Sequence, residues 1–216
     1  MKKYTYIFFD LDGTISDSAP GIVNSVTYAL NHMGTEIKDR EQLKKFVGPP
    51  LAESFSMYYG YSSEETEQAV KFFREYYQEK GILENSMYEG MDLLLKKLTQ
   101  AGMIPVVATS KPEPFARTIL QRYGIDHYFL YIAGSTIDET RTKKDEVIAY
   151  ALETCAITDK SKVVMIGDRA HDVIGAKKNG LDCIGVLYGY GERKELEDAG
   201  VIRIAEDLNE LADILI

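Results

Sequence analysis

Residues 6–14 read YIFFDLDGT, and this stretch decides how the chain can fold and where its chemistry can lie. Four apolar or aromatic residues in a row are typical of a buried strand in a parallel sheet. Asp10 and Asp12 follow at the carboxyl end of that strand, where open α/β sheets bind ligands. Two carboxylates there can hold a hard cation, and one of them can attack or pass a proton. The same letters also suit a plain turn, so the rest of the chain has to decide.

Composition bounds the class of protein. The chain has 216 residues, 45% hydrophobic and 27% charged, which is typical of a globular protein. Its net charge of −9 argues against a nucleic-acid-binding protein. No apolar stretch approaches the roughly 18 residues that span a bilayer, so we expect no membrane segment. Cys155 and Cys183 lie in apolar patterns and are predicted to be free thiols, which favours a cytoplasmic location.

The chain alternates strand and helix patterns in its second part. From residue 89 onward, helical spacing of apolar residues alternates with short apolar runs at 103–108, 128–133, 163–166 and 183–186. Such alternation predicts parallel strands joined by right-handed crossovers. Residues 16–88 contain helical patterns and no convincing buried strand. The sequence therefore predicts a doubly wound, mainly parallel α/β core over 1–15 and 89–216, with a helical domain inserted over 16–88.

Polar side chains follow each predicted core strand. Parallel strands bring their carboxyl ends to one edge of the sheet, so these residues can meet in one pocket. Asp10, Asp12 and Asp168 offer three oxygen ligands for Mg²⁺. The Thr109 hydroxyl, nearby backbone N–H groups and a lysine can hold phosphate oxygens. The residues at these strand ends are Asp10, Asp12, Thr109, Ser110, Lys143, Lys144, Asp168, Arg169 and Asp172.

Each of these features alone has a simpler structural interpretation. Thr109 and Ser110 can cap the next helix, Lys143 and Lys144 can begin a solvated helix, and Asp168 can belong to a turn. All of them occurring together, in this order and at strand ends, favours one functional site.

Four ordered motifs carry a resemblance to a known family. They are DLDGT at 10–14, ATSKP at 108–112, KDEVI at 144–148 and IGDRAHD at 166–172, and the segment GVLYGYG at 185–191 extends the likeness. The chain resembles phosphatases of the haloacid dehalogenase superfamily, in the branch similar to phosphoglycolate phosphatases. The resemblance implies a Rossmann-like core, with residues 16–88 as a helical cap that closes over the site, excludes water and selects the substrate.

The resemblance also implies a role for each motif residue. Asp10 would be the nucleophile that becomes phosphorylated, and Asp12 would protonate the leaving alcohol and then activate water. Asp10, Asp12 (through its carbonyl) and Asp168 would hold Mg²⁺, with Asp172 in support. Thr109, Ser110 and Lys144 would bind the phosphoryl group. Dehalogenases of the superfamily lack the second aspartate, so Asp12 favours phosphoryl chemistry.

Three positions are left open by the sequence. Lys143 and Lys144 compete for the phosphate-binding role, and spacing to Val147 and Ile148 favours Lys144. Lys111 follows Thr109 and Ser110 and is a candidate for a substrate contact. The segment Tyr188–Gly191 either borders the site or is a connector before a helix.

The predicted function is Mg²⁺-dependent hydrolysis of a small phosphomonoester through an aspartyl phosphate. Phosphoglycolate and nucleoside 5′-monophosphates are the expected substrates. A pyrophosphatase, a phosphomutase with the same two aspartates, and a non-catalytic phospholigand sensor are the alternatives. The expected partner is a small phosphorylated metabolite, with neither nucleic acid nor membrane, and the expected state is a monomer or small homo-oligomer.

Overall fold

A computed structural model describes residues 4–138 and 140–216. The chain divides into two compact units: Met1–Ser16 with Met87–Ile216 form the first, and Asp17–Ser86 form the second. The first unit is called the core unit below, and the second the helical unit. Within the described residues, no helix combines the length and the apolar character needed to cross a bilayer.

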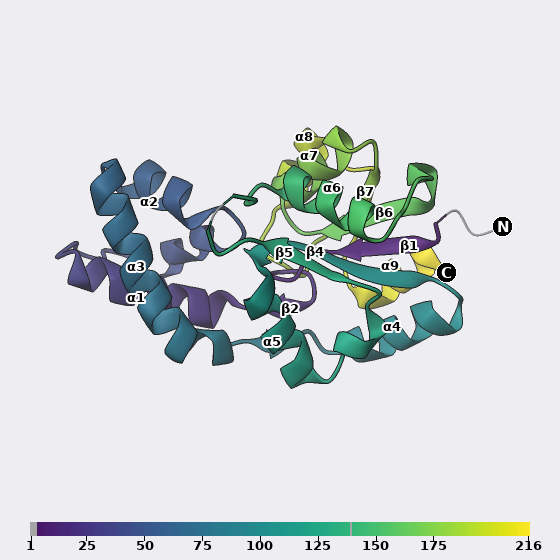
Figure 1. The fold of residues 1–216 in the computed structure, drawn as a ribbon, viewed down its shortest axis with the longest axis horizontal. Helices are drawn as coiled ribbons and strands as arrows, with labels where there is room; N and C mark the ends of the chain where they lie inside the picture. The colour runs from purple at the N-terminus through teal and green to yellow at the C-terminus, as the bar shows by residue number, and fades with distance from the viewer. Residues whose placement is uncertain (1–3, 139) are drawn as a thin grey trace. The chain divides into compact units, whose positions relative to one another are not determined.

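The core unit is built on a parallel sheet of six strands with β1 near its centre (Figure 1). Phe8 of β1 lies beside Val106 of β4 on one side and Met165 of β6 on the other. The strand pairs of this sheet are parallel, which confirms the predicted fold class. In spatial order the strands are β5 (Ile132–Ser135), β4 (Ile104–Pro112), β1 (Tyr6–Phe9), β6 (Val163–Gly167), β7 (Asp182–Val186) and β8 (Arg203–Ala205).

Helices cover both faces of this sheet, as the strand–helix alternation predicted. Figure 1 shows α6, α7 and α8 on one face and α4, α5 and α9 on the other. Apolar side chains of the strands, such as Phe8 and Met165, are fully buried beneath α6 and α7. The bounds are α4 (Met91–Gln100), α5 (Glu113–Tyr123), α6 (Lys144–Thr154), α7 (Ala170–Lys178), α8 (Arg193–Ala199) and α9 (Leu208–Leu215), with single 3₁₀ turns at Asp126–Tyr128 and Lys160–Lys162.

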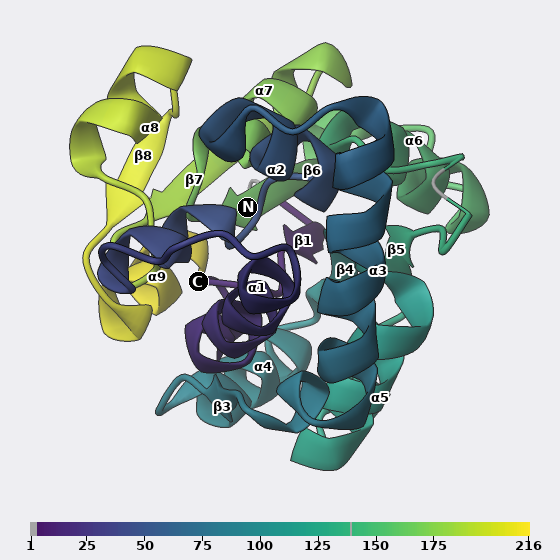
Figure 2. The ribbon, with the colours of Figure 1, turned by 90° about the vertical axis from the view of Figure 1, so that its left-hand side faces the viewer.

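The helical unit consists of α1 (Ala19–His32), α2 (Leu51–Tyr59) and α3 (Ser63–Glu79), with 3₁₀ segments at Glu41–Phe46 and Gly81–Leu83. Both α1 and α2 pack against α3 (Figure 2). Ser62 begins α3 with a capping box: its hydroxyl accepts from Glu65 N, and the Glu65 carboxylate accepts from Ser62 N. Two short strands, β2 (Ser16–Asp17) and β3 (Ser86–Met87), pair where the chain passes between the units.

The structure corrects the bounds of two predicted strands. The third strand begins at Ile132 rather than at residue 128, because the chain first makes a 3₁₀ turn at Asp126–Tyr128. The second strand continues through Pro112, so Thr109 to Lys111 belong to an extended segment rather than to a turn. The β8 strand and α9 were not predicted. Both cysteines are free thiols as expected, with Cys183 buried and Cys155 partly buried.

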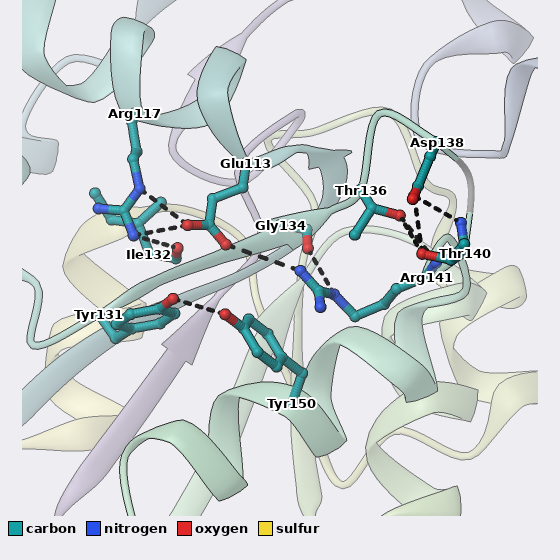
Figure 3. Close-up of polar contacts among 10 residues, drawn as sticks. All are labelled: Glu113, Arg117, Tyr131, Ile132, Gly134, Thr136, Asp138, Thr140, Arg141 and Tyr150. Carbon is teal, nitrogen blue, oxygen red and sulfur yellow. Dashed lines mark hydrogen bonds and ion pairs between the residues drawn. The ribbon is translucent and has the colours of Figure 1, made fainter.

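The outer edge of β5 is covered by side chains (Figure 3). Because Tyr131 O accepts from Val107 N on the β4 side, the carbonyls of Ile132 and Gly134 face the other way. Arg117 Nη2 donates to Ile132 O at 3.2 Å, and Arg141 Nε donates to Gly134 O at 3.0 Å. These two arginines therefore occupy carbonyl groups that an edge strand otherwise offers to another chain.

One carboxylate and two tyrosines hold these arginines in place. Glu113 lies 2.8 Å from Arg117 and 3.9 Å from Arg141. The Arg141 guanidinium lies 3.7 Å from the centre of the Tyr150 ring, and the Tyr150 hydroxyl is 2.8 Å from that of Tyr131. The group of Glu113, Arg117, Tyr131, Arg141 and Tyr150 is called the edge network below.

Candidate active site

Asp10 lies where the central strand ends. Its backbone N–H donates to Ile166 O at 2.9 Å, which continues the pairing of β1 with β6 by one residue. Gly13 turns the chain away with a φ of 83°, and a Cβ there would lie only 2.2 Å from Asp168 Oδ2. Only glycine meets both demands, so this loop brings Asp10 and Asp168 to the same end of the sheet.

Three buried carboxylates meet at that end. Oxygen atoms of Asp10, Asp168 and Asp172 all lie within 4.8 Å of one another. Asp10 follows β1, Asp168 follows β6, and Asp172 lies in the first turn of α7. Asp168 has no exposed surface, and among the described residues nothing donates a hydrogen bond to its Oδ1. A buried carboxylate oxygen without a donor, beside two more carboxylates, suits a hard divalent cation such as Mg²⁺.

Burial and mutual repulsion shape the protonation of this cluster. Burial raises the pKa of Asp10 to about 6, with Lys144 opposing the shift and the Asp172 carboxylate adding to it. Burial also raises the pKa of Asp168 well above its ordinary value, helped by Asp172 and Asp10 and opposed by a hydrogen bond from Tyr190 N. The carboxylates thus destabilise one another's charged forms, and a bound cation would relieve that repulsion.

The structure separates the two candidate lysines. Lys144 is buried, and its ammonium lies 2.7 Å from Asp10 Oδ1 and 2.9 Å from Asp172 Oδ1. These carboxylates outweigh the opposing effect of burial and raise the pKa of Lys144, so it stays charged. Lys143 is exposed and is the residue before α6. The geometry thus agrees with the preference for Lys144 at the Asp10 end of the site.

The residues of the second motif differ in their burial and in the groups that they contact. Thr109 is buried, and its hydroxyl accepts from Lys111 N at 3.2 Å. Ser110 is partly exposed. Lys111 turns inward, and its ammonium donates to both oxygens of Asp12, at 2.7 and 2.8 Å. The Asp12 carboxylate therefore contacts Lys111 and lies outside the cluster of three carboxylates, whereas the sequence-based ligand set used the backbone carbonyl of Asp12.

The sequence left open whether the segment Tyr188–Gly191 borders the site or only connects to a helix. Tyr190 N donates to Asp168 Oδ2 at 2.7 Å, and the Tyr188 hydroxyl donates to Thr14 O at 3.0 Å. A Cβ on Gly191 would lie 1.7 Å from Asp168 O. The segment Tyr188–Gly191 therefore borders the site and fastens Asp168 to the loop after β1. The glycines of GVLYGYG were the only signal of this close approach in the sequence.

Comparisons with known proteins agree with this geometry. The family model described as haloacid dehalogenase-like hydrolase matches residues 7–186. A 5′-nucleotidase from Pseudomonas aeruginosa is 40% identical over 213 residues, covering 99% of this chain and 96% of the relative. The tyrosine-protein kinase PtkA of Mycobacterium tuberculosis is also 40% identical, over 97% of this chain and 72% of its own length.

A solved structure shares both fold and sequence. The crystal structure of a predicted phosphatase from Clostridium acetobutylicum is 45% identical, with a TM-score of 0.94 over 97% of each chain. These matches confirm the family resemblance that the motifs indicated: the family model covers residues 7–186, and this structure covers 97% of the chain. With its parallel sheet, its acidic strand ends and the matching family model, this chain belongs to the haloacid dehalogenase-like hydrolase family.

Proposed function

We propose that this hydrolase is a Mg²⁺-dependent phosphatase that acts on small phosphomonoesters through a phosphorylated Asp10. The observation that carries the proposal is the buried arrangement in which the Lys144 ammonium lies 2.7 Å from Asp10 while Asp168 and Asp172 stand within 4.8 Å. A carboxylate is a weak nucleophile in water. Here the Asp10 carboxylate is held beside the Lys144 ammonium and beside two further carboxylates. This arrangement suits a carboxylate that attacks phosphorus.

The proposed reaction has two steps that balance. An Asp10 oxygen attacks phosphorus and forms a new P–O bond, while the bond from phosphorus to the alcohol oxygen breaks and Asp12 gives that oxygen a proton. Water then attacks phosphorus and gives a proton to Asp12, while the bond to Asp10 breaks and phosphate leaves. Lys144 stays charged beside Asp10 throughout and stabilises negative charge on the transferring oxygens.

The residues present fit a magnesium ion. Asp10 and Asp168 would hold it together with the backbone carbonyl of Asp12, with Asp172 in support, since these groups offer hard oxygen ligands and Asp168 Oδ1 has no donor among the described residues. When bound, Mg²⁺ supplies positive charge that offsets the carboxylates and the phosphoryl oxygens.

The substrate is proposed by class. Two relatives share the same 40% identity with this chain, and one is named a 5′-nucleotidase and the other a tyrosine-protein kinase. Sequence identity alone therefore does not determine the substrate. Nucleoside 5′-monophosphates come first because the nucleotidase relative is covered over 96% of its length. Phosphoglycolate comes second, because the motifs resemble that branch.

The test is phosphate release from a panel of nucleoside 5′-monophosphates, phosphoglycolate, sugar phosphates and pyrophosphate. Each is assayed with Mg²⁺ and with EDTA. We expect selective release that needs Mg²⁺ and that falls at least about 10³-fold in Asp10→Asn, because the nucleophile is lost. Asp213→Asn, on the exposed side of α9, is the matched control and should retain activity.

Other outcomes would redirect the proposal. Isomerised sugar phosphate in excess of free phosphate would indicate a mutase, and release from pyrophosphate alone would indicate a pyrophosphatase. Tight binding of a phosphorylated ligand without turnover by the folded, metal-loaded protein would indicate a sensor. Full activity in Asp10→Asn would exclude the phosphorylated aspartate.

A further inference from the structure

Lys111 and Asp12 form a buried ion pair inside the core unit. The Lys111 ammonium contacts both carboxylate oxygens of Asp12, at 2.7 and 2.8 Å, and each residue is only 8% exposed. The two side chains are 5% and 9% exposed, so the contact is shielded from water. Charge-assisted contacts of this kind are among the strong hydrogen bonds of proteins, and this one holds the Asp12 carboxylate at a fixed position beside Lys111.

An irregularity in β4 delivers Lys111 to this place. Ala108 pairs with Ala133 and Pro112 pairs with Ser135, so β4 uses four steps where β5 uses two. The extra residues form a bulge, and bulges beside active sites re-aim side chains. The Thr109 hydroxyl accepts from Lys111 N and steadies the bulge. Gly134 allows it to lie close, since a Cβ there would come within 2.6 Å of Lys111 O.

The two buried lysines serve different carboxylates. Lys144 lies between Asp10 and Asp172, at 2.7 and 2.9 Å. Lys111 comes from a different strand and contacts Asp12. The charge of Lys111 is thus directed at the proposed acid–base residue, whereas the sequence had suggested a contact with substrate. We propose that Lys111 is a positioning residue that holds the ionised Asp12 carboxylate in place for the water-activating step.

This inference rests on the proposed function and assigns Lys111 to its second step. In that step Asp12 accepts a proton from the attacking water, and the ion pair with Lys111 holds the accepting carboxylate in place. Without Lys111 the carboxylate can rotate or turn away. Phosphorylation of Asp10 by an ester with a good leaving group needs no proton from Asp12, so it should proceed while the phosphorylated protein accumulates.

The test uses the full chain with Mg²⁺ and p-nitrophenyl phosphate. In Lys111→Met we expect a burst of about one nitrophenol per protein, followed by turnover slowed about 10²-fold. Because only the later step slows, kcat and KM should fall together while kcat/KM stays near that of the parent. Acid quenching should trap phosphorylated protein. Lys96→Met, on the exposed side of α4, controls for loss of a lysine.

Two further variants keep the test decisive if Lys111→Met folds poorly. Gly134→Ala leaves every charge in place and pushes on the backbone of both Glu113 and Lys111, so it should produce the same burst with a smaller slowing. In an Asp12→Asn background, Lys111→Met should change turnover less than about 2-fold, since coupled residues are not additive.

The outcomes separate the inference from the function it rests on. A raised KM without a burst, or additive effects of the Lys111 and Asp12 changes, would show that Lys111 binds substrate and would overturn the inference alone. No turnover by the parent chain on any ester, or full activity in Asp10→Asn, would instead overturn the proposed function.

Discussion

The edge network and the three-carboxylate cluster are two polar groups in the same core unit, and they differ in how completely they are satisfied. In the edge network, Arg117 and Arg141 each contact Glu113 and a carbonyl of β5, and the two tyrosines bond to each other (Figure 3). In the cluster, the Lys144 ammonium contacts two of the three buried carboxylates, Asp10 and Asp172, and Asp10 and Asp168 have raised pKa values.

This difference indicates separate roles for the edge network and for the three-carboxylate cluster. A polar network whose members are all paired makes a strand edge rigid and closes it to other chains. A cluster with surplus negative charge is costly until a cation binds, which is typical of functional sites. Changes in the cluster should therefore reduce activity more than stability, and changes in the edge network should do the reverse.

The largest effect that sharpens the contrast is expected at Lys144. Lys144→Met removes the ammonium beside Asp10, so kcat/KM should fall about 10²- to 10³-fold. Lys143→Met, one residue earlier, should stay within about 2-fold, because surface changes are nearly neutral. Steady-state kinetics on the best ester of the panel measures both. Equal losses in the two variants would mean that the Lys144 contacts do not matter to turnover.

The next effect concerns the cation. At a hundred times its Kd, Mg²⁺ should raise the free energy of unfolding of the parent by about 2.7 kcal/mol. Asp168→Asn should lose most of that gain, since it removes one of the ligating carboxylates and the oxygen that lacks a donor. Thermal unfolding with Mg²⁺ and with EDTA checks this without any substrate. An unchanged Mg²⁺ response in Asp168→Asn would place the cation elsewhere.

The sequence predicted residues of the three-carboxylate cluster but not the edge network. Asp10 and Asp168 were predictable because they directly follow strands, and Lys144 because it begins a helix; parallel strands align these ends at one edge. The Lys111–Asp12 pair depends on a bulge in β4 and joins residues 99 apart in sequence, which no periodicity reveals. The edge network likewise joins α5, β5 and α6 through polar side chains. In the sequence, such residues cannot be told from those on any exposed helix.

A smaller effect is expected in the edge network. Arg141→Ala should lower the free energy of unfolding by about 1–3 kcal/mol, because Gly134 O loses its donor and Tyr150 loses the guanidinium over its ring. Its kcat/KM should match that of the parent. Arg141→Lys keeps the charge without the planar donors and should recover only part of the stability. A loss of activity without a loss of stability would break the contrast.

The smallest effect lies at high pH. Burial, together with the hydrogen bond to Tyr150, raises the pKa of Tyr131 from 10.0 to about 12. Between these values the folded chain keeps a proton that the unfolded chain releases, so stability falls as the pH rises through this window. Tyr131→Phe should flatten that fall, and ultraviolet titration should show one late-titrating tyrosine fewer. An unchanged alkaline slope would contradict the assignment.

The central claim is that Asp10 carries the phosphoryl group during turnover. The most direct measurement is mass spectrometry of the protein acid-quenched during steady-state turnover of its best ester with Mg²⁺, with the phosphorylated peptide located by fragmentation. The account predicts phosphate on Asp10, none in Asp10→Asn, and more of it in Lys111→Met than in the parent. Rapid turnover in which no phosphate appears on Asp10 in either the parent or Lys111→Met would contradict it.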